Sequence, residues 1–291
     1  MSKNSWGKPI HVVSPRPWRV RGQTLGGNRP LIMGILNVTP DSFHDGGRFV
    51  SVDSALHRCG DMRDQGADLI DIGGESTRPG AEPVDEAEEI RRVIPMIKAI
   101  VKQFDIPISV DTMKSGVARA ALEAGAAIVN DVSAMTADPK MLEVPQAFGA
   151  GIVLGHMRGT PLNMQQNPHY DDVTREVREF LMERMRIMAA MGISKDHIAV
   201  DPGIGFGKRV EDNLELIENL EMLESIGCPI LLGHSRKSFI GKTPGLENSD
   251  RLMPSVAVAL YAALKGASIL RVHDVKETAE ALRMVEAIRK V

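Results

Sequence analysis

The chain has 291 residues, 43% of them hydrophobic and 25% charged, and its 35 Lys and Arg residues against 38 Asp and Glu give a net charge of -3. This composition is typical of a globular protein with a sizeable core, and the balanced charge excludes a general attraction to nucleic acid or to an anionic membrane. The start of the chain has no apolar signal-peptide core, no run approaches the roughly 20 apolar residues that span a bilayer, and Cys59 and Cys228 have no metal-type spacing, so we expect a cytoplasmic protein.

Residues 1–30 form an N-terminal extension ahead of the first strand pattern. Their segment "HVVSPRPWRVRG" is compatible with a short hairpin that closes the bottom of a barrel and also with a loose tail. From residue 31 to residue 291 one unit recurs: an apolar run of strand length, a polar turn, an amphipathic helical stretch, and a glycine before the next run. Because glycine has no Cβ, it can end a helix in the left-handed conformation. The glycines expected to do so are Gly66, Gly125, Gly149 and Gly266.

Eight apolar runs follow one another in the repeating part of the chain. They read "LIMGILN", "ADLIDIG", "PISVD", "AIVND", "GIVLGH", "IAVDPG", "PILLGH" and "SILRVH". The clearest helical stretch between them is Val173 to Met191, in which apolar residues recur at helical spacing. Strands that are apolar throughout and alternate with helices indicate a parallel sheet covered on its faces. Eight such units without a break in composition favour a single-domain (β/α)8 TIM barrel over an open doubly wound sheet.

Polar residues stand at the end of nearly every predicted strand, which is where a barrel of this type forms its active site. They are Asn37, Asp71, Asp111, Asn130, Asp131, His156, Asp201, Ser235, Lys237, Arg271 and His273. A single Asp after a strand is usually a helix N-cap, and Asp111 and Asp131 both allow that interpretation. Several carboxylates and asparagines at one mouth are harder to explain as caps, because buried like charges are unfavourable unless a ligand supplies donors. They predict a heterocyclic ligand with several N–H groups and a carbonyl.

Lys237, Arg271 and His273 follow the last two strands, the place where barrels commonly bind phosphate. A helix predicted to start at "SRKS" would add free backbone N–H groups. We therefore expect an anionic ligand at this cluster of positive charge, with surface salt bridges as the alternative.

Three loops complete the predicted mouth. "NVTPDSFHDGGRF" and "GGESTRPGAEPVDEAEE" are long enough to act as mobile covers, and Arg78 would bring a further cation over the mouth. The stretch "DPGIGFGK" fits neither the P-loop nor the dinucleotide spacing. Its glycines are expected to let backbone approach a flat ligand, beside the ring of Phe206.

Seven segments stand in an order that resembles the dihydropteroate synthase family of pterin-binding enzymes: "ILNVTPDSF", "GGESTRPG", "SVDT", "VND", "DPGIGFGK", "GHSRKSFIG" and "RVHDV". Members join a dihydropterin pyrophosphate to p-aminobenzoate in folate biosynthesis, and sulfonamides compete with p-aminobenzoate. The resemblance implies a TIM barrel, a homodimer and Mg2+ as cofactor. The sequence departs from the family at two positions. Many members have Ser in place of His44 in the loop, and Phe in place of Ile204 in the pocket lining.

The resemblance also implies a role for individual residues. The pterin would be held by Asp111, Asn130, Asp201 and Lys237. The pyrophosphate would be held by Asn37, Arg78, Arg271 and His273, with Mg2+ near Asn37. The p-aminobenzoate pocket would be shaped by Phe43, Thr77, Pro79, Phe206 and Ser238. The catalytic set among these would be Asp111, Asp201, Lys237, Arg271 and His273.

The implied reaction begins with loss of pyrophosphate from a carbon attached to an electron-rich ring. The carboxylates would stabilise positive charge on the pterin, the cations would stabilise the leaving group, and the neutral aniline nitrogen would attack without a strong general base. Two other functions fit part of the pattern. A pterin-binding methyltransferase that uses a methyl-folate and a corrinoid partner would share the Asp and Asn residues, and a catalytically silent pterin-binding module would not need the covering loops.

Overall fold

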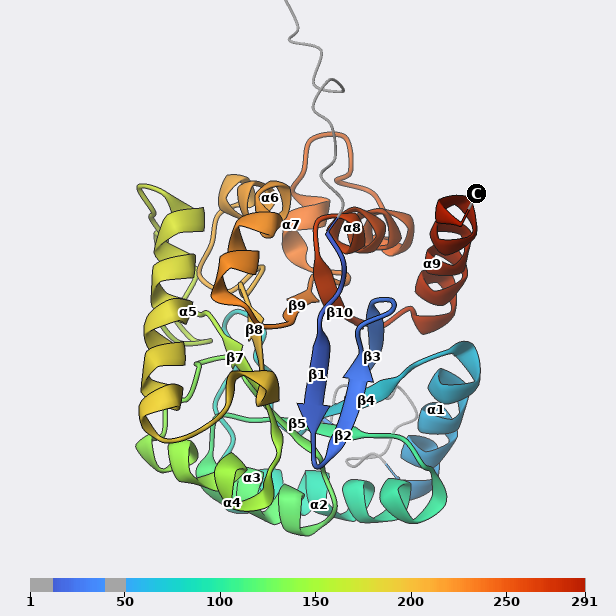
Figure 1. The fold of residues 1–291 in the computed structure, drawn as a ribbon, viewed down its shortest axis with the longest axis vertical. Coiled ribbons are helices and arrows are strands. Elements are labelled where there is room, and N and C mark those ends of the chain that lie inside the picture. Colours follow the sequence, from blue (N-terminus) through green and yellow to red (C-terminus); the bar gives the residue numbers. More distant parts are fainter. Residues whose placement is uncertain (1–12, 40–50, 291) are drawn as a thin grey trace, which may run out of the picture.

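The computed structural model describes residues 13–39 and 51–290 and has eight parallel strands that close into a barrel (Figure 1). The eight strands are β3 (Leu31–Asn37), β4 (Leu69–Gly73), β5 (Ile108–Asp111), β6 (Ile128–Asp131), β7 (Gly151–Gly155), β8 (Ile198–Asp201), β9 (Ile230–Gly233) and β10 (Ala267–Val272). Strand β10 pairs with both β9 and β3 and so completes the ring. The prediction of a (β/α)8 TIM barrel is confirmed.

Helices surround the barrel between successive strands (Figure 1). They are α1 (Val52–Gln65), α2 (Glu86–Gln103), α3 (Ser115–Glu123), η3 (Pro139–Glu143), α4 (Val144–Phe148), α5 (Val173–Ala190), η4 (Lys195–His197), α6 (Val210–Glu218), η5 (Leu220–Ile226), α7 (Ser238–Gly241), α8 (Leu252–Leu264) and α9 (Val275–Arg289). Helix α5 confirms the helix predicted from residue 173 onward. The four glycines expected in the left-handed conformation all have positive φ angles.

The core has two layers, as the apolar strands require. Side chains that point into the barrel, among them Met33, Ile128 and Leu231, form one buried cluster. A larger buried cluster fills the space between the strands and the surrounding helices. Because both faces of each strand are covered, the strand ends are the places where polar side chains can meet solvent or a ligand.

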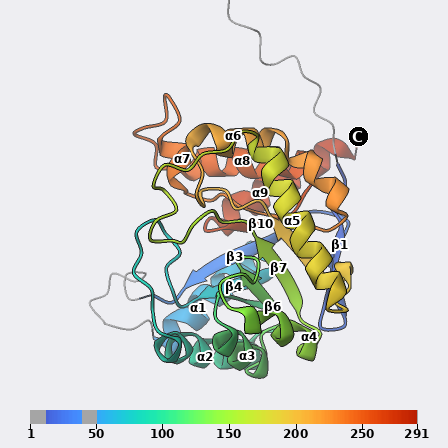
Figure 2. The same ribbon diagram turned by 90° about the vertical axis from the view of Figure 1, so that its left-hand side faces the viewer.

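A two-stranded hairpin, β1 (Pro17–Val20) and β2 (Gln23–Gly26), packs against the N-terminal ends of the barrel strands. Its turn residues Arg21 and Gly22 have φ angles of 45° and 80°, as a two-residue hairpin turn of this hand requires. The ring of Trp18 is fully buried, and its Nε1 donates to the carbonyl of His197 at 2.9 Å. In Figure 2 the hairpin lies on the opposite side of the barrel from α7, so it closes the end away from the strand carboxyl ends.

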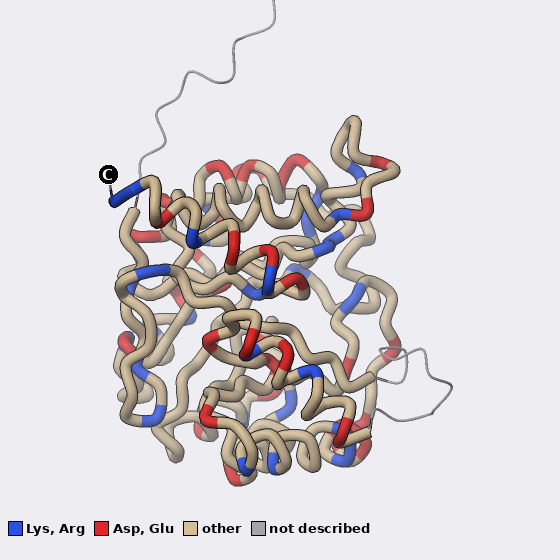
Figure 3. Tube along the Cα trace, turned by 90° about the vertical axis from the view of Figure 1, so that its right-hand side faces the viewer, with Lys and Arg blue, Asp and Glu red and all other residues tan. Residues whose placement is uncertain are grey.

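Acidic and basic positions are interspersed over the helices in the view of Figure 3, in keeping with the balanced net charge. Within the described residues, none of the helices combines the length and the apolar character needed to cross a membrane.

Candidate functional site

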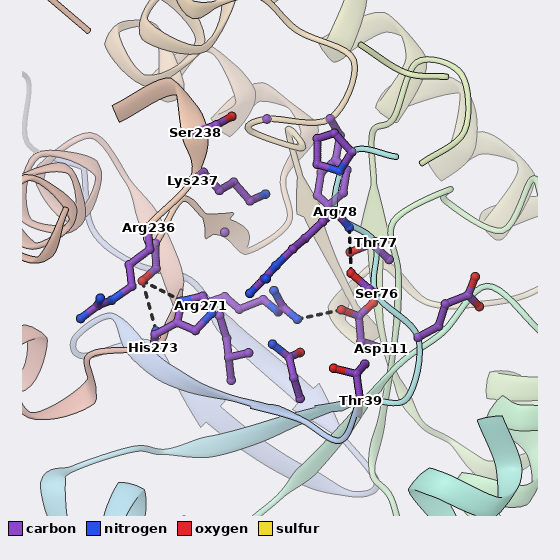
Figure 4. Close-up of a pocket in the computed structure, with 18 of the residues that line it drawn as sticks. Thr39, Ser76, Thr77, Arg78, Asp111, Arg236, Lys237, Ser238, Arg271 and His273 are labelled. Atoms are coloured by element: carbon purple, nitrogen blue, oxygen red, sulfur yellow. Dashed lines mark hydrogen bonds and ion pairs between the residues drawn. The ribbon is translucent and has the colours of Figure 1, made fainter. Parts of the chain in front are cut away.

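A cavity of about 630 Å³ opens at the carboxyl ends of the strands (Figure 4). Most of the site residues predicted from the sequence line it, namely Asn37, Thr77, Arg78, Pro79, Asp111, Phe206, Lys237, Ser238, Arg271 and His273. Asn130 and Asp201 are buried at the same end of the barrel but are not part of the cavity wall. Phe43 and His44 lie outside the described residues. The structure therefore gathers segments more than 200 residues apart around one space.

Arg271 lies at the centre of the cavity floor. From β10 its Nε donates to Asp71 Oδ2 at 2.6 Å, and its Nη2 donates to Asp111 Oδ2 at 2.7 Å. Asn130 Nδ2 also donates to Asp71 Oδ2, at 3.2 Å. Arg271, which was predicted to bind the pyrophosphate, is thus paired directly with Asp111, which was predicted to bind the pterin. Asp71, noted at a strand end but given no role, is the common partner of Arg271 and Asn130.

Asp111 has one carboxylate oxygen left for a ligand. Burial raises the pKa of Asp111 to about 7, against the opposing effect of the Arg271 guanidinium. Its Oδ1 has no hydrogen-bond partner among the residues that the structure describes. Asp131 differs, because its carboxylate accepts from the backbone N–H groups of Ser133 and Met135 at 2.7 and 3.1 Å. Asp131 therefore caps the turn at residues 132–135 and not a helix, since the next helix begins at Pro139 with Asp138 as its N-cap, while Asp111 lines the cavity.

Asp201 is buried next to Gly233, a residue of the cavity wall. Its Oδ1 accepts from the backbone N–H of Gly203 at 2.7 Å. Its Oδ2 would be 3.8 Å from a Cβ built on Gly233, a residue that lines the cavity. Burial raises the pKa of Asp201, and the positive charge of Lys237 opposes that rise. The absence of a side chain at residue 233 leaves this carboxylate within reach of a ligand.

The donors in "GHSRKS" separate into structural and cavity-facing groups. His234 is fully buried, its Nε2 lies 3.0 Å from the carbonyl oxygen of Ser255, and burial lowers its pKa to about 4. Arg236 donates to both carboxylate oxygens of Asp274, at 2.9 and 2.7 Å. His234 therefore shapes the loop after β9, Arg236 lines the cavity with its charge paired to Asp274, and Lys237 supplies a further charge to the cavity.

Lys237 lies against the wall formed by the loop after β8. Its Nζ is 4.0 Å from the centroid of the Phe206 ring, and it donates to the carbonyl of Ile204. Burial lowers the pKa of Lys237 to about 8, while the Asp201 carboxylate opposes the shift. The helix expected after it, α7, is a single turn of four residues. Few peptide dipoles align in so short a helix, so the positive field comes mainly from side chains.

His273 differs from the sequence prediction, which counted it among the positive charges. Burial lowers the pKa of His273 to about 4, with the Arg271 guanidinium acting in the same direction. Its backbone N–H donates to Ser235 Oγ at 3.2 Å, and the same oxygen lies 3.1 Å from Nδ1. At neutral pH His273 therefore offers an uncharged imidazole that is oriented by Ser235.

The loop between β4 and α2 carries Thr77, Arg78 and Pro79 over the cavity (Figure 4). Its base is anchored by ion pairs from Lys114 Nζ to Glu75 and to the fully buried Glu89, the latter at 2.6 Å. Arg78 is exposed, and its backbone N–H donates to Ser76 Oγ at 3.4 Å. The loop predicted to be a mobile cover is thus held at its base. The other predicted cover falls largely outside the described residues.

The glycine-rich loop after β8 packs against the chain itself. Gly203 has a φ of 68°, and a Cβ on it would lie 1.8 Å from the carbonyl oxygen of His156. Gly205 has a φ of 82°, and a Cβ on it would lie 2.9 Å from Lys237 Cδ. The prediction that the glycines let backbone approach a ligand is wrong for Gly203, whose nearest neighbour is the backbone of His156, directly after β7. Ile204 was expected in the pocket lining, but its side chain is fully buried in the core.

Arg251 is a cavity residue that the sequence interpretation missed. It lines the cavity from the start of α8, and its Nη1 donates to the carbonyl of Arg236 at 3.2 Å. A Cβ on Gly241 would lie 2.9 Å from its Nη2, so the guanidinium lies over the end of α7. No strand-end position marks Arg251, and no pattern in the sequence points to it.

Comparison with known proteins agrees with this site. A family model described as "Pterin binding enzyme" matches residues 33–273. The dihydropteroate synthase of Escherichia coli (strain K12) is 46% identical over 267 residues, which cover 92% of this chain and 94% of that protein. A Yersinia pestis dihydropteroate synthase solved with a sulfonamide drug is 45% identical, with a TM-score of 0.89 and coverage of 94% of this chain and 100% of that one. A Xanthomonas albilineans dihydropteroate synthase solved with 4-aminobenzoic acid is 46% identical, with a TM-score of 0.88 and coverage of 96% and 100%.

Identity of this extent over nearly the full length of both chains shows the class of protein first: a barrel enzyme that binds a pterin. The chain belongs to the pterin-binding enzyme family and, within it, to the dihydropteroate synthases. Dihydropteroate synthases are transferases, and this membership favours the synthase reaction over the methyltransferase alternative.

Proposed function

We propose that the cavity joins a dihydropterin pyrophosphate to p-aminobenzoate by the residues described above. The observation that carries this assignment is the division of the cavity around Arg271. Asp111, whose Oδ1 has no partner among the described residues, lies on one side, and Arg78, Arg271 and the oriented His273 supply donors on the other. A ligand with N–H groups at one end and an anion at the other matches that division.

The pterin is assigned to the space above Asp111 and Asp201. A reduced pterin presents ring N–H groups and an exocyclic amine, which donate to carboxylates. Asp111 Oδ1 has no partner within the described residues, and Asp201 is reachable past Gly233. Asn130 would add its carbonyl oxygen, because its amide nitrogen already donates to Asp71. Lys237 would close the site from the side of Phe206.

The pyrophosphate is assigned to Arg271, Arg78, His273 and Asn37. Arginine guanidinium groups match phosphate oxygens in geometry and keep their charge. Mg2+ is assigned beside Asn37, which lines the cavity and has an amide oxygen of the kind that Mg2+ accepts as a ligand. No cluster of three metal-ligating side chains occurs in the described part of the chain, and Mg2+ commonly takes few protein ligands and completes its shell with phosphate oxygens and water. When bound, the ion would neutralise charge on the leaving pyrophosphate.

The p-aminobenzoate is assigned to the outer part of the cavity, between Thr77, Pro79, Phe206 and Ser238. Phe206 and Pro79 offer apolar surface to the ring, and Ser238 offers a hydroxyl to the carboxylate. Arg251 lies beside Ser238 along the same wall and would supply a positive charge to that carboxylate. A sulfonamide with the same aniline group would compete for this space. Phe43 keeps its predicted place in this pocket as a proposal.

The reaction follows from the charges around the bond that breaks. As pyrophosphate leaves, positive charge spreads over the dihydropterin, and the Asp111 and Asp201 carboxylates stabilise it. Arg271 and Arg78 stabilise the departing anion, and His273 donates to it as a neutral imidazole. The aniline nitrogen then attacks the exposed carbon and releases a proton to solvent. A neutral aniline is nucleophilic without a strong base.

The activity is tested directly by product formation. With 6-hydroxymethyl-7,8-dihydropterin pyrophosphate, p-aminobenzoate and Mg2+, the purified protein is expected to form 7,8-dihydropteroate, detected by mass spectrometry. A sulfonamide is expected to inhibit competitively with p-aminobenzoate. Binding of the pterin without product would contradict the assignment and favour a methyltransferase or a silent binding module.

The ammonium of Lys237 predicts an alkaline limit to pterin binding. Its pKa is lowered to about 8, so the side chain loses its charge as the pH rises through that value, and affinity is expected to fall by up to about tenfold per pH unit above it. Lys237→Arg keeps the charge and the contact with the Phe206 ring. Calorimetric titration of 6-hydroxymethylpterin from pH 6.5 to pH 9.5 should therefore show the limit in the wild type and not in the variant. Identical profiles would show that another group titrates.

The remaining expectations concern the whole protein. We propose that residues 31–291 form the catalytic barrel domain and that residues 1–30 serve as its N-terminal extension. We also propose a cytoplasmic location, because Cys59 and Cys228 are both buried free thiols. A homodimer is proposed through the outer faces of α8 and α9, where Met253, Met284 and Ile288 are exposed apolar side chains.

A further inference from the structure

Lys208 is a buried lysine to which the reaction described above gives no part. It ends the loop between β8 and α6, its side chain is 3% exposed, and it does not line the cavity. Its Nζ donates to the carbonyls of Gly203 and Phe206 at 2.9 and 3.1 Å and lies 2.9 Å from His156 Nδ1. The carbonyl oxygen of His156 lies farther away, at 3.5 Å, so the three closer partners match the three donors of an ammonium group, which has no acceptor.

The third partner, His156, is prepared to accept. Burial lowers its pKa well below the ordinary value, with Lys208 acting in the same direction, so the ring is neutral. For Nδ1 to accept from Lys208, the ring proton must be on Nε2. The edge-on contact with the Phe180 ring, 5.0 Å between centroids at 87°, fixes the ring plane. In that arrangement His156 accepts from Lys208 beneath the loop as a neutral ring.

The loop that Lys208 holds is the one that builds the pterin end of the cavity. Gly203 donates its backbone N–H to Asp201, and Phe206 presents its ring to Lys237. The carbonyl between them, that of Ile204, accepts from Lys237 Nζ. Lys208 binds the carbonyls of Gly203 and Phe206, one on each side of that carbonyl. A shift of these two carbonyls would move the supports of both Asp201 and Lys237.

The charge of Lys208 also affects Asp201, in addition to the hydrogen bonds through the loop. Burial lowers the pKa of Lys208 to about 7; among the charged groups around it, Asp201 and Asp212 favour its ammonium, whereas Lys237 and Arg158 oppose it. In turn the Lys208 charge favours the ionised form of Asp201. A carboxylate buried at the end of β8 stays charged more easily when a cation lies behind it.

We propose that Lys208 is a positioning residue for the pterin. From behind the loop it holds Gly203 and Phe206, and through them it sets the place of Asp201 and Lys237. This inference rests on the proposed assignment of the pterin to Asp201. It predicts that Lys208 affects recognition of the pterin end of the substrate and leaves the pyrophosphate end, around Arg271 and Arg78, unaffected.

The test compares Lys208→Met with Lys265→Met. Lys265 is 5% exposed and donates to Glu221 at 3.0 Å at the end of α8, away from the cavity, so the control also removes a buried amine. Affinities for 6-hydroxymethylpterin and for inorganic pyrophosphate with Mg2+ are measured separately by calorimetry. Lys208→Met is expected to bind the pterin at least tenfold more weakly and pyrophosphate within about twofold of the wild type. Lys265→Met is expected to match the wild type for both ligands.

A second pair of variants tests the same claim through His156. His156→Asn keeps an acceptor near the position of Nδ1 and is expected to retain most of the pterin affinity, whereas His156→Leu is expected to lose it as Lys208→Met does. This pair decides the matter if Lys208→Met does not fold. The positioning role would be overturned by equal loss of affinity for the pterin and for pyrophosphate in Lys208→Met and His156→Leu. It would also be overturned if both of these variants bound the pterin like the wild type.

Failure of the pterin assignment itself would show differently. In that case Asp201→Asn would also bind the pterin like the wild type. Normal binding by the Lys208 and His156→Leu variants together with lost binding by Asp201→Asn would refute the inference and leave the assignment intact.

Discussion

Replacement of Arg271 by Met is expected to lower kcat/KM for the dihydropterin pyrophosphate by about 10²–10³-fold, the effect of removing a main donor to a developing anion. Arg271 spans the floor of the cavity and is one of the two positively charged side chains assigned to the leaving group. Calorimetry should show loss of pyrophosphate binding. The affinity of this variant for a pterin without phosphates is expected to fall less, because Asp111 and Asp201 both remain.

The structure adds a second effect that the sequence did not predict. Arg271 pairs with Asp71 at 2.6 Å and with Asp111 at 2.7 Å, so its removal leaves two buried carboxylates without a counter-charge. Breaking a buried pair in this way typically costs roughly 3 to 5 kcal/mol. Asp111, whose pKa is already raised to about 7, is expected to take up a proton and relieve part of that cost.

Arg271→Lys serves as the matched control. It keeps the charge but cannot donate to both carboxylates in the geometry of a guanidinium. It is expected to recover much of the melting temperature and little of the pyrophosphate affinity. Equal loss of pterin and pyrophosphate affinity in Arg271→Met, at a melting temperature close to the wild type, would contradict the assignment of Arg271 to the leaving group.

Replacement of Asp201 by Asn is expected to have the opposite profile. The Asn amide puts a donor or a weaker acceptor where the pterin presents N–H groups. A buried polar group without a matching partner costs much binding free energy. We therefore expect pterin affinity and kcat/KM to fall by roughly 10³-fold. Pyrophosphate binding should be retained, because Arg78, Arg271 and His273 are untouched. Separate calorimetric titrations of the two ligands measure both effects.

Stability provides the control for this variant. Burial raises the pKa of Asp201, which means that the charged carboxylate is costly in the folded chain, and Asn removes that cost. The melting temperature of Asp201→Asn is therefore expected to equal or exceed that of the wild type. A large fall in melting temperature together with loss of both ligands would show that Asp201 is structural.

The barrel and the position of the site were predictable because both depend on local patterns. Uniformly apolar strands alternating with helices require a covered parallel sheet, and in a barrel the polar residues after those strands, such as Asn37, Asp111 and Lys237, meet at one mouth. The sequence did not distinguish a hairpin from a tail at Trp18. That outcome depends on the fit of one indole against Gly151, a contact between segments far apart in the chain.

The ion-pair partners and the protonation states of the site residues could not be predicted either, because they too depend on contacts between distant segments of the chain. The ion pairs of Arg271 join β10 to β4 and β5 across the barrel, and no sequence spacing shows which carboxylates it meets. His273 is neutral because it is buried near Arg271, and burial of one side chain is a property of the whole fold. Arg251 reaches the cavity from a loop without strand or helix periodicity. These are long-range effects, and they decide the electrostatics of the site.

The division of the cavity into a pterin end and a pyrophosphate end is tested most directly by the release of pyrophosphate. Purified protein is mixed with dihydropterin pyrophosphate and Mg2+, with and without p-aminobenzoate, and pyrophosphate and dihydropteroate are followed together. We expect pyrophosphate to appear in equal amount to dihydropteroate when p-aminobenzoate is present. Binding of the dihydropterin pyrophosphate without release of pyrophosphate under either condition would contradict the assignment of Arg271, Arg78 and His273 to a leaving group.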